Sequence, residues 1–226
     1  MDANLLSLRD LAPLKTWSLL MTILGDCEAT PAEPVRSGVL RDLLGELGVT
    51  PEAARVSLHR LRKDGWVDAQ KRGRESDYYL TEKGLSETRA VRRRVYAADL
   101  PELETWTLHA VETVQHLPQT PHVVLSPHLV ALPLGTVMPD SFILAPAHVA
   151  PSWVHRRCLP QDLRALAEGL IRQAAPETAA ERILILHHWR RLSLRDGFWL
   201  SRALDPGGQA DRCRVAALAA IGVRSL

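Results

Sequence analysis

Seven lysine and arginine side chains lie between residues 55 and 74, and their type and spacing indicate one chemistry, the contacting of phosphate groups. Two aspartates lie in the same segment, so its local charge is +5, although the whole chain has a formal charge of +2. Residues 99–226 contain twelve basic and twelve acidic residues and are neutral. A solvated charged face is the alternative that charge alone leaves open.

The first half of this basic segment is predicted to be a helix that ends near Asp64. Thr50 is a good N-cap, Pro51 suits the first helical position, and Glu52 favours the positive start of the helix. Gly65 suits the position that follows the last turn. A preceding helix and a short turn at residues 48–49 complete the spacing of a helix-turn-helix.

The two sides of this helix differ in chemistry. At 100° per residue, Ala54, Leu58 and Leu61 fall on one side, which we expect to be buried. The opposite side is basic, and a capped helix with a basic outer side is what insertion into the major groove of DNA requires. The DNA-binding candidates on this helix are Thr50, Glu52, Arg55, Val56, His59, Arg60 and Lys63.

A β-hairpin is predicted directly after the helix. Residues 66–70 alternate as a strand, and residues 77–80 also have strand composition. The turn between them, residues 71–76, carries three cations around a glycine, so it forms a basic wing that could reach phosphates or a minor groove. The candidates on this wing are Lys71, Arg72 and Arg74.

Helices predicted over residues 17–25, 37–48 and 82–98 surround these two elements, so residues 1–98 are expected to form a winged helix-turn-helix that binds double-stranded DNA. Arg92, Arg93 and Arg94 could instead serve only to solubilise the last helix. A winged helix that mediates protein contacts is a further alternative, against which the basic wing argues.

Two blocks of different composition follow. Residues 99–160 contain nine of the fifteen prolines with short β-branched runs between them, and residues 161–226 return to helical periodicity. Helices are predicted over 162–173, 177–194 and 209–221. Their dense apolar content favours a homodimer, with Trp189 or Trp199 as anchors near a two-fold axis.

Residues that could form a catalytic or metal site are scattered. The acidic residues of the middle block form no carboxylate motif suited to a nuclease metal pair, and there is no phosphate loop or nucleophile elbow. The histidines and cysteines show no second close pair at zinc-finger spacing; these are His155, Cys158, His187, His188 and Cys213. We expect no catalytic residue, no metal and no cofactor, and keep a DNA-targeted nuclease-like enzyme as the alternative.

Composition also bounds the compartment. No apolar run reaches the roughly 18 residues that a membrane span needs, and the first ten residues lack a basic and then apolar signal pattern. Three widely spaced cysteines suit a reducing compartment better than a disulfide framework. The expected location is the cytoplasm.

The helix and wing segment resembles the PaaX family of bacterial repressors. The resemblance covers the stretch from Gly48 to Trp66 and extends to further short motifs. These are Leu24-Gly25-Asp26, Arg72-Gly73-Arg74, Tyr78-Tyr79-Leu80-Thr81, Lys83-Gly84 and Arg94-Val95-Tyr96, with His188 to Asp196 near the end of the chain.

This resemblance implies an effector-responsive homodimeric repressor of a catabolic operon, with phenylacetyl-coenzyme A or another acyl-coenzyme A as the effector. It also implies an α+β architecture with three domains: a winged helix-turn-helix over 1–98, a ferredoxin-like middle domain over 99–160 and a helical C-terminal domain over 161–226. The middle block departs from the family because residues 106–111 run almost directly into the prolines at 118–121. Little room remains for the first ferredoxin-like helix, so a degenerate middle domain is expected.

Overall fold

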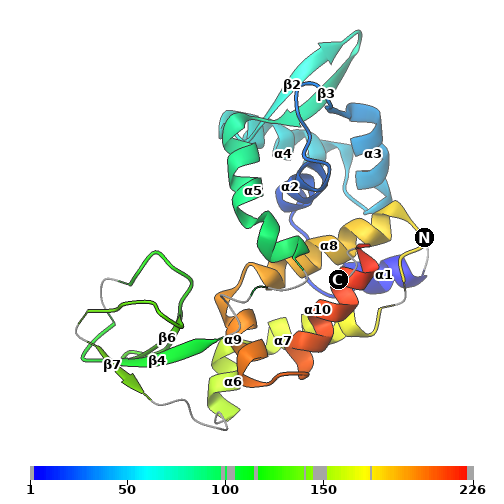
Figure 1. Ribbon diagram of the computed structural model, residues 1–226. Coiled ribbons are helices and arrows are strands. Elements are labelled where there is room, and N and C mark those ends of the chain that lie inside the picture. Colours follow the sequence, from blue (N-terminus) through cyan, green and yellow to red (C-terminus); the bar gives the residue numbers. More distant parts are fainter. Residues whose placement is uncertain are drawn as a thin grey trace. The chain divides into compact units, whose positions relative to one another are not determined.

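The chain divides into two compact units, each assembled from two segments of sequence (Figure 1). The first unit consists of residues 1–93 with 173–188, and the second of residues 94–172 with 189–226. The computed structural model describes residues 3–97, 100, 105–114, 117–139, 141–144, 152–173 and 175–222. Segment 173–188 was expected in a C-terminal helical domain, but it belongs to the first unit.

The first unit contains a helix-turn-helix followed by a β-hairpin. Its elements are α1 (Ala3–Asp10), α2 (Thr16–Asp26), β1 (Val35–Arg36), α3 (Ser37–Glu46), α4 (Pro51–Lys63), β2 (Val67–Arg72), β3 (Glu75–Leu80) and most of α5 (Glu82–Tyr96). The three strands form an antiparallel sheet in the order β1-β3-β2. In Figure 1 the β2–β3 hairpin extends beyond the helices of this unit. Helix α1 and strand β1 were not predicted.

The core of this unit is built mainly from leucines. Helix α4 packs against α2, α3 and β2. Side chains no more than 9% exposed come from each of these elements and from β3; they are Leu19, Leu20, Leu24, Leu40, Leu44, Leu47, Leu58, Leu61, Val67 and Leu80. Because interiors are close-packed, this cluster fixes the orientation of α4 about its own axis.

The first half of α8 (Ala179–Ser193) is joined to α1 and α2 by polar contacts as well as by packing. His187 and His188 are 7% and 1% exposed. Nδ1 of His187 lies 3.2 Å from the Thr22 hydroxyl, and Nε2 of His188 lies 2.9 Å from the Leu8 carbonyl oxygen. A bidentate pair from Arg182 to Asp26, with a shortest distance of 2.6 Å, adds an ionic contact. Burial therefore gives these two histidines a structural role.

The second unit joins a sheet to a group of helices. Its sheet contains β4 (Trp106–Val111), β5 (Val123–Ser126), β6 (Leu129–Pro133) and β7 (Ser141–Leu144), antiparallel in the order β5-β6-β4-β7. Its helices are α6 (Ser152–Cys158), α7 (Gln161–Ile171), the last part of α8, α9 (Asp196–Leu204) and α10 (Gln209–Ala220). The two antiparallel sheets among many helices confirm the predicted α+β class. No helix in the described part of the chain is long and apolar enough to cross a membrane.

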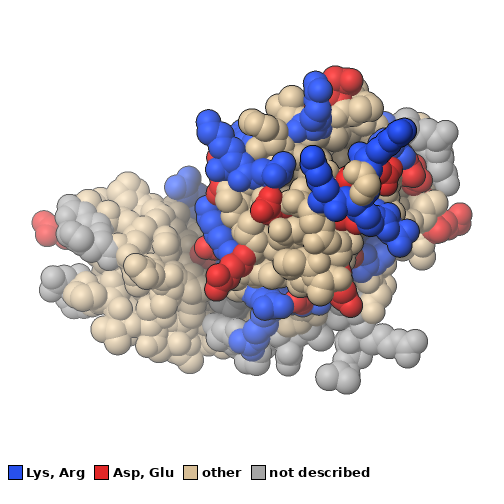
Figure 2. All heavy atoms as spheres, turned by 90° about the horizontal axis from the view of Figure 1, so that it is seen from above, with Lys and Arg blue, Asp and Glu red and all other residues tan. Residues whose placement is uncertain are grey.

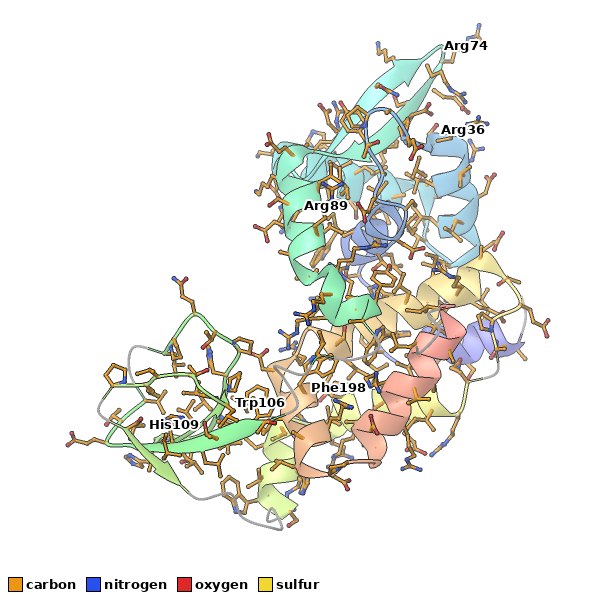
Figure 3. All side chains as sticks on the ribbon, in the orientation of Figure 1. Arg36, Arg74, Arg89, Trp106, His109 and Phe198 are labelled. Carbon is orange, nitrogen blue, oxygen red and sulfur yellow. The ribbon has the colours of Figure 1, made fainter. Side chains whose placement is uncertain are left out.

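The prediction that Trp189 or Trp199 anchors a subunit interface is wrong. Their side chains are 0% and 1% exposed, and both rings meet Phe198 edge to face. The indole N–H of Trp189 donates to the carbonyl oxygen of Val95, and that of Trp199 donates to Ser193, each at 2.7 Å. Both rings are therefore buried and hydrogen-bonded within one chain, next to Phe198, which is labelled in Figure 3.

Candidate nucleic-acid interface

Helix α4 begins where the sequence predicts it to begin. The backbone N–H of Ala53 donates to the Thr50 hydroxyl at 3.2 Å, and Pro51 occupies the first helical position. Glu52 lies in the first turn, where a carboxylate favours the positive end of the helix. An N-cap of this kind stabilises a helix by about 1 kcal/mol. Local sequence therefore fixes the start of α4.

The end of α4 is fixed by a glycine turn and by the start of α5. Gly65 has a φ of 73°, and the N–H groups of Gly65 and Trp66 donate to the last turn of α4 at 3.1 and 2.9 Å. This pair of bonds is a Schellman motif. Thr81 Oγ1 donates to the Gly65 carbonyl oxygen at 2.6 Å, and Lys83 Nζ lies 4.9 Å from the centroid of the Trp66 ring. The hairpin and α5 are thereby attached to the end of α4.

The predicted register of α4 is confirmed. Leu58 and Leu61 are 9% and 5% exposed, whereas His59, Arg60 and Lys63 are exposed. Val56 also lies on the outer side with 64% of its surface exposed. Arg55 and Glu52 are exposed toward the helix start. The outer side of α4 is therefore free to meet a partner along most of its length.

Ion pairing on this helix leaves most of its positive charge available. Arg60 lies 3.6 Å from Asp64, and Arg62 lies 3.2 Å from Asp68, in pairs that are about half exposed or more. Such surface pairs contribute about 0–1 kcal/mol, so a phosphate can displace them at little cost. Among the described residues, no carboxylate lies within ion-pair distance of Arg55 or Lys63.

The wing is longer and its turn tighter than the sequence predicts. The β2–β3 pairing continues to Arg72 opposite Glu75, so the turn consists of two residues, Gly73 and Arg74. Gly73 has a φ of 64°, and a glycine with positive φ at the first central position is typical of a type II′ hairpin turn. Figure 3 shows Arg74 at the tip of the hairpin. Lys71 and Arg74 are exposed, and neither has an acidic partner among the described residues.

The third wing cation is held differently. Nε of Arg72 lies 3.2 Å from Oδ2 of Asp77, whose side chain is only 5% exposed. Oδ1 of Asp77 is buried without a hydrogen-bond partner. Arg72 is therefore the main compensation for a buried carboxylate, and its guanidinium is less available to a phosphate than those of its neighbours. From the sequence alone, all three wing cations are equivalent candidates for phosphate contact.

Arg36 is a surface cation that sequence reasoning missed. It lies in β1, directly opposite Asp77 in the β1–β3 pairing, and it is exposed (Figure 3). Strand β1 has only two residues, which is too short to show an alternating pattern. The pairing brings Arg36 to the same sheet as the wing, so the basic surface extends from the hairpin to the start of α3.

Three of the four arginines of α5 form internal ion pairs. Arg89 and Arg92 lie 3.1 and 3.2 Å from the two carboxylate oxygens of Glu28, which has a φ of 45°. Arg94 lies 2.7 Å from Asp196 in the second unit, with both side chains less than a quarter exposed. These contacts hold the loop after α2 and the start of α9, and they account for part of the positive charge of α5.

Figure 2 shows that many Lys and Arg side chains gather on the face that carries the hairpin. By contrast, the sequence has no Lys or Arg between Arg94 and Arg156. The positive excess is local to residues 55–74, on α4 and the wing, which carry a charge of +5. A surface of this kind attracts polyanions at long range.

Two of the three cysteines and one histidine of the middle sheet are buried. Burial raises the pKa of both Cys158 and Cys213 to about 12, which keeps these thiols protonated. Burial also lowers the pKa of His109, whose ring nitrogens lie 3.0 and 2.9 Å from the hydroxyls of Thr107 and Ser141. Within the described residues, no group of three His, Cys, Asp or Glu side chains is arranged to hold a metal ion.

The comparisons with known proteins point to the same segment. Residues 15–84 match the family model of PaaX-like proteins. The transcriptional repressor PaaX of Escherichia coli (strain K12) is 36% identical over 89 residues, which are 39% of this chain and 28% of that protein. The chain thus matches little more than a quarter of that relative. The predicted resemblance near residues 188–196 lies outside the family match and stays a prediction. Over residues 15–84, which include every candidate on α4 and the wing, the predicted resemblance to PaaX-like proteins is confirmed.

Proposed function

We propose that this protein is a DNA-binding transcriptional regulator, and specifically a repressor, that uses α4 and the β2–β3 wing as its DNA contact. The single observation that carries the proposal is the exposed, largely unpaired cationic surface on a helix whose register and both ends are fixed. The similarity to a protein named as a transcriptional repressor supports it. A cytoplasmic location follows from this function.

In this proposal α4 enters the major groove and the wing contacts the flanking backbone. Arg55 lies near the helix start, where recognition helices contact bases, and Arg or Lys can bond to both acceptors of a guanine. Val56 is exposed without a packing role, which fits contact with a thymine methyl group. His59, Arg60 and Lys63 face the same groove or its phosphates, while Thr50 and Glu52 hold the helix start.

A homodimer is the expected assembly. Non-specific phosphate contacts alone give dissociation constants of about 10⁻⁴–10⁻⁶ M, so a single head with this surface binds weakly. In a dimer on an inverted repeat, binding of the first winged helix holds the second at a high effective concentration near its half-site, so the two together bind more tightly than either alone. Half-sites would then lie about 34 Å apart or at a multiple of that spacing. Trp189 and Trp199 are internal, so in this proposal the interface uses other residues of the second unit.

The middle sheet supports a reduced ferredoxin-like domain. Its strand order, β5-β6-β4-β7, has the first strand at the centre beside the third and fourth, and all pairs are antiparallel. No helix lies in the described residues between β4 and β5, which are 112–114 and 117–122. An acyl-coenzyme A effector, carried over from the family resemblance, would bind in this unit or in its helices.

The test is selection of a binding sequence from a random duplex library, followed by fluorescence anisotropy on the enriched duplex. Arg55→Ala should cost about 1–3 kcal/mol and relax the preference at one base pair, whereas Lys63→Ala should weaken binding to all duplexes equally. The matched control is Arg172→Ala, which removes an exposed arginine that pairs with Glu168 in the second unit. This control should leave the affinity for DNA unchanged. If no sequence is enriched, or if Arg55→Ala and Lys63→Ala bind like the wild type, the proposal is wrong.

A further inference from the structure

A cavity of about 320 Å³ lies between the two helices of the helix-turn-helix, on the side of α4 that faces α3. Its floor is apolar and its rim is polar. Apolar side chains of Leu40, Leu44, Val49, Pro51, Ala54 and Leu58 form most of the lining, together with Gly45. The cavity lies wholly within the first unit.

Two of the residues that line this space, one on each facing helix, are small. Gly45 on α3 and Ala54 on α4 both line it, where larger side chains would fill a close-packed interface. A Cβ atom added to Gly45 would meet nothing within 4 Å, and Gly45 is exposed, so it lies at the open side of the cavity. Glycine near the end of a helix lowers its stability relative to alanine.

The rim has the chemistry of an anion site. Four polar side chains reach it, namely Arg41, Arg55, Ser37 and Tyr78, and no Asp or Glu is among the lining residues. Arg41 pairs at 3.3 Å with its neighbour Asp42, but both side chains are more than 60% exposed, so the pair is weak. No carboxylate among the described residues pairs with Arg55. A guanidinium beside an apolar floor fits a carboxylate attached to an apolar body.

We propose that this cavity binds a small monocarboxylate whose apolar body lies between α3 and α4 and whose carboxylate is bound by Arg55 and Arg41. The volume is at the lower end of ligand pockets, which suits a ligand of about ten non-hydrogen atoms and excludes an acyl-coenzyme A. Because Arg55 is also a proposed DNA contact, the ligand and DNA compete for one guanidinium. This second half of the inference, the antagonism, rests on the proposed function.

Isothermal titration calorimetry of the full chain without DNA tests the site itself. The probes are benzoate and hexanoate, with benzamide and hexanamide as neutral controls of the same shape. At least one carboxylate should bind, with a dissociation constant of about 0.1–1 mM expected for so few atoms, and its amide at least tenfold more weakly. Arg55→Gln should weaken carboxylate binding at least tenfold by removing the anion contact, and Gly45→Leu should abolish it by placing a large apolar side chain across the open side of the cavity.

Fluorescence anisotropy on the selected duplex tests the antagonism. The bound carboxylate should raise the dissociation constant for DNA, and reciprocally DNA should weaken the carboxylate. Gly45→Leu should bind DNA as the wild type does but no longer respond to the carboxylate, and its circular dichroism spectrum and melting temperature report whether it is folded.

Each negative result has a distinct meaning. Carboxylate binding that survives Gly45→Leu in a folded protein, or the absence of binding by both probes, overturns the site. Carboxylate binding without any change in DNA affinity overturns the antagonism. A protein that binds no DNA refutes the proposed function, while the calorimetric result still decides the site.

Discussion

Removing the two free wing cations with Lys71→Ala and Arg74→Ala should weaken DNA binding at every sequence and flatten its salt dependence. Both side chains are exposed and have no acidic partner among the described residues, so each is available for one phosphate. Each lost phosphate contact lowers the log–log slope by about 0.9, so the double variant should lose about 1.8. Between about 50 and 200 mM salt, the affinity of the wild type should fall about twelvefold more than that of the variant.

Arg72→Ala is the informative companion to this double variant. Because Arg72 is paired with the buried Asp77 carboxylate, the Arg72→Ala variant should change the slope of the salt dependence by less than about 0.9. Its free energy of unfolding should fall by about 1–3 kcal/mol, because the Asp77 carboxylate loses its partner. The assay is fluorescence anisotropy of one duplex over a series of KCl concentrations, with urea unfolding for stability. Arg172→Ala should match the wild type in slope. If the double variant keeps the full slope, the wing does not contact the DNA backbone.

Gly84→Ala should destabilise the first unit by about 1–3 kcal/mol in urea unfolding, because its Cβ would overlap a backbone carbonyl oxygen at the start of the hairpin. Gly45→Ala is the matched control and should be neutral or stabilising by up to about 1 kcal/mol; equal losses for both variants would contradict this packing argument. In the native protein at pH 8 a thiol reagent should label Cys27, which is exposed, and not Cys158 or Cys213, which are buried; labelling of all three before unfolding would contradict the burial. Burial raises the pKa of these two thiols from 9.0 to about 12, so the folded state holds protons that the unfolded state releases. The free energy of unfolding should therefore fall as the pH rises from about 9 toward 12. A free energy of unfolding that stays constant over this range in urea titrations would contradict the shift.

The sequence by itself determined the features of the candidate surface that depend on neighbours along the chain. Thr50 and Gly65 mark the ends of α4 because capping and a left-handed turn are set by the residues at those positions. The spacing of Leu58 and Leu61 gives the buried side, since 3.6 residues per turn leaves one arrangement of the apolar stripe. Gly73 likewise indicates the wing turn, although not its two-residue length.

The tertiary structure alone decided the features that depend on partners far apart in the chain. The β1–β3 pairing brings Arg36 opposite Asp77, and the burial of Asp77 separates Arg72 from the other wing cations. The cavity beside Gly45 arises from how two helices face each other, which no periodicity encodes. Segment 173–188 joins the first unit because buried polar contacts to α1 and α2 favour that position. Periodicity shows which side of an element is buried, but the element that covers it is selected only by packing and pairing across the folded chain.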